Sequence, residues 1–152
     1  MQIWVDADAC PKRVKEVLYR AADRTKTSVT LVANQYLATP PSPYVQAIQV
    51  PSGFDVADNE ILNRCEPPDL VITADVPLAD AAVAKGCGAL NPRGKQYTPE
   101  NIKDHLQGRD MREELRDLGV IGGGPDAYGK KDLQAFANAL DKYVARFVKQ
   151  PG

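Results

Sequence analysis

Acidic residues stand where two apolar segments of the sequence end. Asp6 and Asp8 come directly after the apolar run Ile3–Val5, and Asp75 follows the segment Asp69–Thr73. Carboxylates brought together repel one another, by about 1 kcal/mol per pair at about 4 Å in water and by about 4 kcal/mol in a partly buried site. A cation relieves this repulsion, and Mg²⁺ or Mn²⁺ prefers such hard oxygen ligands. Because such an ion activates water and neutralises a phosphoryl group, the acids point to phosphoryl chemistry.

Four more acids are candidates to complete such a site. Asp55, Asp58 and Glu60 follow a short strand candidate that ends at Val50, and Asp80 lies in an alanine-rich helical segment. Glu60 and Asp80 equally suit the solvated face of a helix. The sequence alone does not decide which of four acids complete the site: Asp8, Asp55, Glu60 and Asp80.

Some of the same acids could instead have a structural role, as helix caps or turn residues. Asp8, Asp55 and Asp75 occupy positions where aspartate commonly caps a helix or closes a turn. Asp6 is different, because it directly follows a buried strand, where an unpaired charge is costly. We therefore take Asp6 as the centre of the expected site.

Regular elements alternate along the chain and would position these acids. Apolar and β-branched runs predict strands, and apolar residues at helical spacing predict helices. The predicted strands are 2–6, 28–33, 47–50, 69–73 and 87–91; the predicted helices are 11–24, 56–65, 78–85, a short one opening at 98–100, 109–118 and 131–148, with a glycine break at 122–125.

This alternation predicts one α/β domain over residues 1–152: a three-layer sandwich with a mostly parallel sheet of about four or five strands and helices on both faces. Ligands of such sheets bind beyond the carboxyl ends of the strands. The acids named above, Asn34 after the second strand and Thr73 at the end of the fourth should therefore lie at one edge.

Candidate substrate contacts come from the same edge and from the turn after the last predicted strand. Asn34 and Thr73 offer hydrogen bonds, and Arg93 and Lys95 could grip phosphate, although a solvated face explains the two cations as well. The Cys10-Pro11 step invites a nucleophilic reading, but the neighbouring Asp residues oppose a lowered thiol pKa, so we expect a structural cysteine.

Composition excludes several classes of site and protein. The single histidine, His105, rules out a site with two histidine ligands from one chain, and three scattered cysteines favour reduced thiols over disulfides or zinc. A net charge of −1 argues against binding nucleic acid by charge alone. Without an export signal or an apolar run of about 18 residues, we expect a cytoplasmic protein outside the membrane.

Several motifs in order resemble the YaiI/YqxD family of uncharacterised bacterial proteins. The likeness runs from residue 1 to about residue 148. The residues that carry it are Val5–Pro11, Val32–Gln35, Gly53–Ile61, Ile72–Asp75 and Asn91–Gly94.

That family is grouped with PIN-like domains, which are metal-dependent nucleases acting on RNA or DNA. The resemblance implies a PIN-like fold. In the PIN pattern one acid follows the first strand, another lies in an Asp-x-x-Ile helix, and a third ends a Thr-x-Asp step. Their counterparts in this sequence are Asp6, Asp58 and Asp75. A further acid of the PIN pattern has no clear counterpart, and Asp8 is the candidate to replace it.

Three functions compete at this point. The first is a Mg²⁺- or Mn²⁺-dependent nuclease with catalytic Asp6, Asp8, Asp58 and Asp75, in which Asp6, Asp58, Asp75 and Asp55 hold the metal. The second is a haloacid-dehalogenase-like phosphatase. Its Asp-x-Asp motif is matched and Asp75 and Asp80 resemble its later acidic pair, but its following Thr or Val is replaced by Ala9. The third is a PIN-like module that binds or regulates without catalysis.

Overall fold

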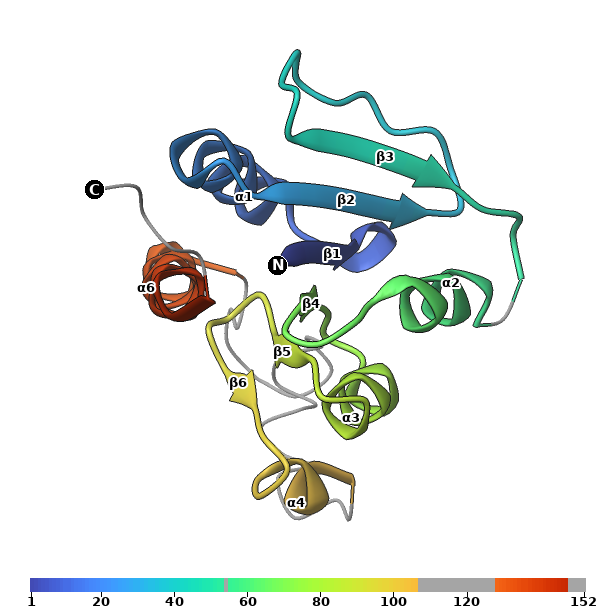
Figure 1. Cartoon of the computed structure of the whole chain (residues 1–152), viewed down its shortest axis with the longest axis vertical. Helices are drawn as coiled ribbons and strands as arrows, with labels where there is room; N and C mark the ends of the chain where they lie inside the picture. The colour runs from blue at the N-terminus through green and yellow to red at the C-terminus, as the bar shows by residue number, and fades with distance from the viewer. Residues whose placement is uncertain (54, 107–127, 148–152) are drawn as a thin grey trace.

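The computed structural model describes residues 1–53, 55–106 and 128–147 (Figure 1). Its sheet has six strands in the order β3-β2-β1-β4-β5-β6, of which the first five run parallel and β6 runs antiparallel to β5. The strands are β1 Gln2–Asp6, β2 Ser28–Ala33, β3 Val45–Gln49, β4 Leu70–Ile72, β5 Gly88–Leu90 and β6 Gln96–Tyr97.

Helices cover both faces of this sheet, which confirms the predicted three-layer α/β fold. Helices α1 (Lys12–Thr25) and α6 (Lys130–Phe147) lie on one face, and α2 (Val56–Arg64) and α3 (Val76–Ala84) lie on the other (Figure 1). A 3-10 turn, η1 (Ala7–Ala9), follows β1.

The alternation of side chains along β1 explains the two layers of core. Ile3 and Val5 pack with Leu18 of α1 and Phe136 of α6, whereas Trp4 points to the opposite cluster. The second cluster includes Ile61 of α2 and Leu78 of α3. A short helix, α4 (Ile102–Leu106), packs beside β6 through a third cluster.

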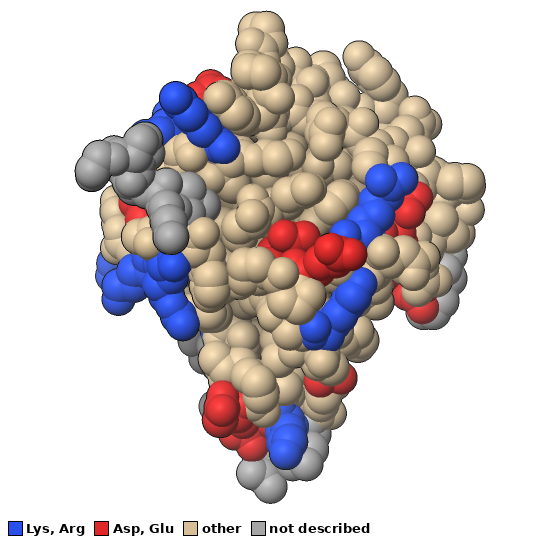
Figure 2. Space-filling view, viewed as in Figure 1, with Lys and Arg blue, Asp and Glu red and all other residues tan. Residues whose placement is uncertain are grey.

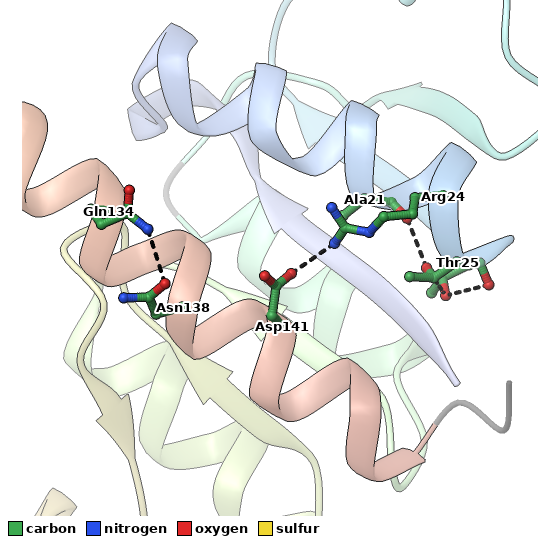
Figure 3. Close-up of polar contacts among 7 residues, drawn as sticks. Ala21, Arg24, Thr25, Gln134, Asn138 and Asp141 are labelled. Atoms are coloured by element: carbon green, nitrogen blue, oxygen red, sulfur yellow. Dashed lines mark hydrogen bonds and ion pairs between the residues drawn. The ribbon is translucent and has the colours of Figure 1, made fainter.

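Figure 3 shows how α1 and α6 meet at their solvent-facing side. Arg24 Nη2 lies 2.7 Å from Asp141 Oδ1, and both side chains are more than half exposed. An exposed pair of this kind contributes only about 0–1 kcal/mol. The two helices are therefore held mainly by their buried apolar residues, such as Leu18 and Leu140.

The sheet has one strand more than the four or five predicted, and residues 87–91 do not form the last strand. Asn91 Oδ1 accepts hydrogen bonds from the backbone N–H groups of Arg93 and Lys95, and Asn91 N–H donates to Lys95 O. This turn folds the chain back so that the two-residue strand β6 pairs with β5. Two residues carry no hydrophobic periodicity, so the pattern could not reveal β6.

Some predicted elements cannot be compared with the structure. The expected helix at 109–118, the glycine break at 122–125 and residue 148 at the end of the last helix lie outside the described residues. Among the helices that the structure describes, none is long and apolar enough to span a membrane.

Candidate acidic site

The strand order reverses at β1: β2 and β3 follow on one side of it, and β4, β5 and β6 follow on the other. β1 pairs with β2 on one side and with β4 on the other, which makes a crevice at the carboxyl ends of β1 and β4. Asp6 is the last residue of β1, and Thr73 directly follows β4. The predicted residues thus stand at the place in this fold where ligands usually bind.

Thr73 joins the acids of the two strands. Its Oγ1 donates a hydrogen bond to Asp6 Oδ2 at 2.9 Å and accepts one from the backbone N–H of Asp75 at 3.0 Å. Thr73 is almost fully buried, so this arrangement is fixed within the fold. The structure therefore brings Asp6, Thr73 and Asp75 together, as the sequence predicted.

Asp75 also has the structural role that its position suggested. It is the N-cap of α3, and its Oδ1 accepts a hydrogen bond from Leu78 N–H at 3.0 Å. This bond engages one carboxylate oxygen of an exposed residue. The two readings of Asp75 are compatible, because the cap holds the carboxylate in place at the rim of the crevice.

Asp55 and Asp58 reach the same edge from the start of α2. Asp55 precedes the helix in the left-handed backbone region, with φ 63°, and its side chain makes no capping hydrogen bond. Asp58 lies in the first turn and shares a hydrogen bond with the carboxyl group of Asp55. Asp55 is therefore better explained by its contact with Asp58 than as a cap.

Neighbouring acids affect the protonation of Asp6 and Asp58. Burial, together with the charges of Asp6, Asp75 and Asp55, raises the pKa of Asp58 from 3.8 to about 6. Burial also raises the pKa of Asp6, against the lowering effect of the Thr73 hydroxyl, and the charges of Asp75 and Asp8 add to the rise. We call Asp6, Asp8, Asp55, Asp58 and Asp75 the acidic cluster.

Asp8 and Asn34 close the cluster toward β2. Asn34 N–H donates a hydrogen bond of 2.8 Å to Asp8 Oδ2, a link between η1 and the β2 exit that the sequence did not predict. Asn34 Oδ1 is buried and has no hydrogen-bond donor among the described residues. Buried acceptors are nearly always satisfied, so this oxygen suits a donor or cation that binds at the site.

Glu60 and Asp80 stand apart from the acidic cluster. Glu60 Oε2 pairs with Arg64 Nε at 3.1 Å on the surface of α2. Neither Glu60 nor Asp80 is among the charges that raise the pKa of Asp6 or Asp58. Of the four acids that the sequence left undecided, Asp8 and Asp55 therefore join the cluster.

In the turn after β5, the Arg93 guanidinium contacts other residues of the fold. Arg93 Nη1 lies 3.1 Å from Asp132 Oδ2 on α6, and the guanidinium stands 5.8 Å from the centre of the Tyr128 ring. The backbone N–H groups of Arg93 and Lys95 are both bound by Asn91 Oδ1. A phosphate contact by Arg93 would have to compete with its ion pair.

Cys10 and His105 fit structural roles. Burial raises the pKa of the Cys10 thiol to about 12, which keeps it protonated at neutral pH and supports the structural reading. His105 is buried and meets the Tyr97 ring edge to face, with ring centres 5.1 Å apart. Tyr97 belongs to β6 and His105 to α4, away from the β1–β4 crevice.

The acidic cluster, as the structure describes it, is not a preformed cage for a metal ion. Within the described ranges, no group of three or more His, Cys, Asp or Glu side chains is arranged to hold a metal ion as it stands. Mg²⁺ retains several waters and often takes one or two carboxylates plus substrate phosphates. The mutual repulsion of the acids and the buried Asn34 Oδ1 are compatible with such an ion.

The raised pKa of Asp58 predicts a pH-dependent effect of Asp58→Asn on stability. Between about pH 4 and pH 6 the folded chain binds more protons at Asp58 than the unfolded chain, so this group destabilises the fold as pH rises through that window. In chelator, we expect Asp58→Asn to raise the melting temperature at about pH 8 by about 2–4 °C, after allowing for solvent screening.

The gain should disappear at about pH 4, where the wild-type carboxyl is protonated in the folded chain. Thermal unfolding at both pH values measures the difference, and Asp80→Asn serves as the matched control outside the acidic cluster. An equal gain for both variants at about pH 8 would contradict the mutual repulsion.

Basic side chains do not form one broad field on the face shown in Figure 2. Among the described residues on that face, Lys and Arg occur in small groups with acidic groups beside them. This agrees with the net charge of −1. A nucleic acid would therefore need local contacts, because general attraction would be weak.

Comparisons with known proteins identify relatives along nearly the whole chain. The model of the uncharacterised YaiI/YqxD family matches residues 4–146. A UPF0178 protein of Shewanella amazonensis is 59% identical over 149 residues, which cover 98% of this chain and 100% of the relative. A UPF0178 protein of Yersinia enterocolitica is 58% identical over 149 residues, 98% of each chain. No solved structure matches.

Proposed function

The chain belongs to the uncharacterised YaiI/YqxD family, and from its acidic cluster we propose that it is a Mg²⁺- or Mn²⁺-dependent nuclease of the PIN-like type, which hydrolyses phosphodiester bonds of RNA or DNA. The observation that carries this proposal is the convergence of Asp6, Asp58 and Asp75 at the carboxyl edge of the sheet, where the charges of Asp6 and Asp75 help to raise the pKa of Asp58 and the charge of Asp75 helps to raise that of Asp6. Such a perturbed group of acids is typical of functional sites.

Asp6, Asp58 and Asp75 would hold the metal, with Asp55 or Asp8 assisting. The bound ion would supply an activated water and neutralise charge on the phosphate. The Thr73 hydroxyl fixes one oxygen of Asp6, and the α3 cap fixes one oxygen of Asp75, so each carboxylate is oriented before a ligand arrives. Asp58 must lose its proton to bind a cation, which becomes favourable above about pH 6.

Asn34, Thr73, Arg93 and Lys95 remain the proposed substrate contacts. Asn34 offers the buried Oδ1 beside Asp8, and Thr73 bridges the two central acids. Arg93 would contribute only by exchanging its Asp132 partner for a phosphate. Asp80 does not act on Asp6 or Asp58, so nothing in its position favours the phosphatase alternative.

Metal binding and cleavage together test the proposal. With Mn²⁺ at about 100 times its Kd, the folded state should gain about 2.7 kcal/mol, seen as a melting temperature higher by about 5–10 °C. Labelled single-stranded RNA and DNA should be cleaved with Mn²⁺ or Mg²⁺ and left intact in chelator. Absence of both effects would contradict the proposal.

Metal binding without cleavage would favour the second candidate, a non-catalytic PIN-like module. The absence of a converged three-ligand group among the described residues is the observation that supports this candidate. Asp6→Asn and Asp58→Asn should each weaken the Mn²⁺-dependent shift in either case, whereas Asp80→Asn should leave it unchanged. The thermal measurement thus locates the ion, and the cleavage assay decides between the two functions.

A further inference from the structure

A cavity beside α1 carries two lysines and a tyrosine. Its volume is about 240 Å³, and its lining includes Lys12, Lys15 and Tyr19 of the helix together with Leu37 of the following loop. Glu16 also lines it and offsets one of the two positive charges. The cavity therefore offers cations and an aromatic ring on one wall, a combination suited to an anionic ligand with planar groups.

A second cavity also has Leu37 in its lining. It measures about 210 Å³ and is lined by residues of the β2–β3 loop and of β3, among them Gln35, Tyr36 and Ile48. Tyr36 is the most exposed large hydrophobic residue described, at 79%. Because Leu37 lines both cavities, we treat them as one surface and call it the loop groove.

The loop groove begins next to the acidic cluster. Its loop starts at Asn34, whose backbone N–H is bound by Asp8 Oδ2. On the helix side, the charges of Lys15 and Asp6 both act on the Cys10 thiol, so a lysine of the groove and an acid of the cluster both lie near this residue. A chain lying in the groove could therefore continue to Asp6 over a short distance.

The charges at the start of α1 are unfavourable without a ligand. Lys12, Arg13 and Lys15 occupy the beginning of the helix, and no acidic residue lies in its first turn. The helix macrodipole disfavours cations at this end. Bound phosphates would offset both the lysine charges and the positive end of the dipole.

We propose that the loop groove binds single-stranded nucleic acid, with Lys12 and Lys15 contacting backbone phosphates and Tyr36 stacking on a base. This assignment builds on the proposed nuclease function and specifies its substrate class. An exposed ring can stack only on a base that is not already paired. With a net charge of −1, the chain also offers a duplex no strong general attraction.

Binding in chelator tests the groove separately from cleavage. Fluorescence anisotropy with labelled oligo-U and oligo-dT of about 12 nucleotides should show that Lys12→Gln/Lys15→Gln weakens binding and lowers the salt slope by about 1.4, since each lost single-strand phosphate contact removes about 0.7. Tyr36→Ala should weaken binding about tenfold with an unchanged slope. The matched control Lys103→Gln/Lys142→Gln changes two exposed lysines outside the groove and should have no such effect.

Three results would overturn the assignment. These are unchanged affinity in both groove variants, equal affinity for a duplex of the same length, and equally tight binding of polyglutamate. Because no metal is present, a failure of the nuclease proposal leaves this result standing. Conversely, if Asp6→Asn abolished cleavage but the groove variants bound normally, the nuclease proposal would stand and only the groove assignment would be rejected.

Discussion

Replacing Asp6 by asparagine is expected to lower metal-dependent cleavage of single-stranded nucleic acid by on the order of a hundredfold or more. Asp6 ends the central strand β1, and its carboxylate accepts the hydrogen bond of Thr73. The charges of Asp75 and Asp8 both raise its pKa. The substitution preserves the size of the side chain and an oxygen that can accept from Thr73. It removes the charge that a cation would need.

The same substitution should not weaken the fold, and this separates a functional effect from a structural one. Burial and neighbouring acids raise the pKa of Asp6, so its ionised form costs stability that the neutral amide does not. We expect an unchanged or higher melting temperature in chelator, measured beside the initial rate of cleavage. Asp80→Asn is the control for both measurements. Cleavage at the wild-type rate in Asp6→Asn would contradict the proposed site.

The meeting of Asp6 and Asp75 could be predicted because it depends on local patterns and on one topological rule. Each acid follows a short run of buried residues, and the carboxyl ends of parallel strands share an edge. The sequence did not need to specify the strand order for this conclusion. With β1 in the centre and β4 beside it, the two exits become direct neighbours.

Roles set by distant partners could not be predicted in the same way. Arg93 looked free to bind phosphate, but α6 supplies Asp132 from 39 positions further along the chain. Glu60 and Asp58 share one helix, and only the direction of each side chain separates the Arg64 pair from the acidic cluster. The pKa of Asp58 likewise depends on burial and on charges from two other strand exits.

The lysines of the loop groove stand at an unusual place in the sequence for cations. Cations in the first turn of a helix oppose the macrodipole, and Lys12 and Lys15 lie in the first turn after Pro11, where acids are usually favoured. These lysines indicate a binding surface only once the structure shows that the β2–β3 loop adds Leu37 and Tyr36 to the same groove. Pattern and tertiary structure together therefore identify the groove, whereas either alone would not.

Removing the carboxylate of Asp69 is expected to cause the largest loss of stability among the substitutions considered. Asp69 precedes β4 at the amino edge of the sheet and is only 8% exposed. Its Oδ1 accepts from Gln2 N–H at 2.9 Å, and its Oδ2 accepts from the Trp4 indole and from Glu66 N–H, both at 3.0 Å. One carboxylate thus joins the backbone and a core side chain of β1 to the start of β4.

Asp69→Ala would leave these three donors without their acceptor. Each unsatisfied buried donor costs about 1–3 kcal/mol, and partial access of water to the sheet edge reduces the sum to about 3–5 kcal/mol. The melting temperature should fall by about 10 °C. Asp141→Ala is the contrast, because its exposed pair with Arg24 contributes about 1 kcal/mol or less.

The loss of the Asp69 carboxylate should also disturb the acidic cluster at the opposite edge of the sheet. β1 and β4 pair only from Ile3 with Leu70 to Val5 with Ile72, and the Thr73–Asp6 bond depends on that short register. Asp69→Asn keeps an oxygen acceptor and should lose less stability than Asp69→Ala, with metal binding retained. If Asp69→Ala and Asp141→Ala lowered the melting temperature equally, the carboxylate would not be what aligns the two central strands.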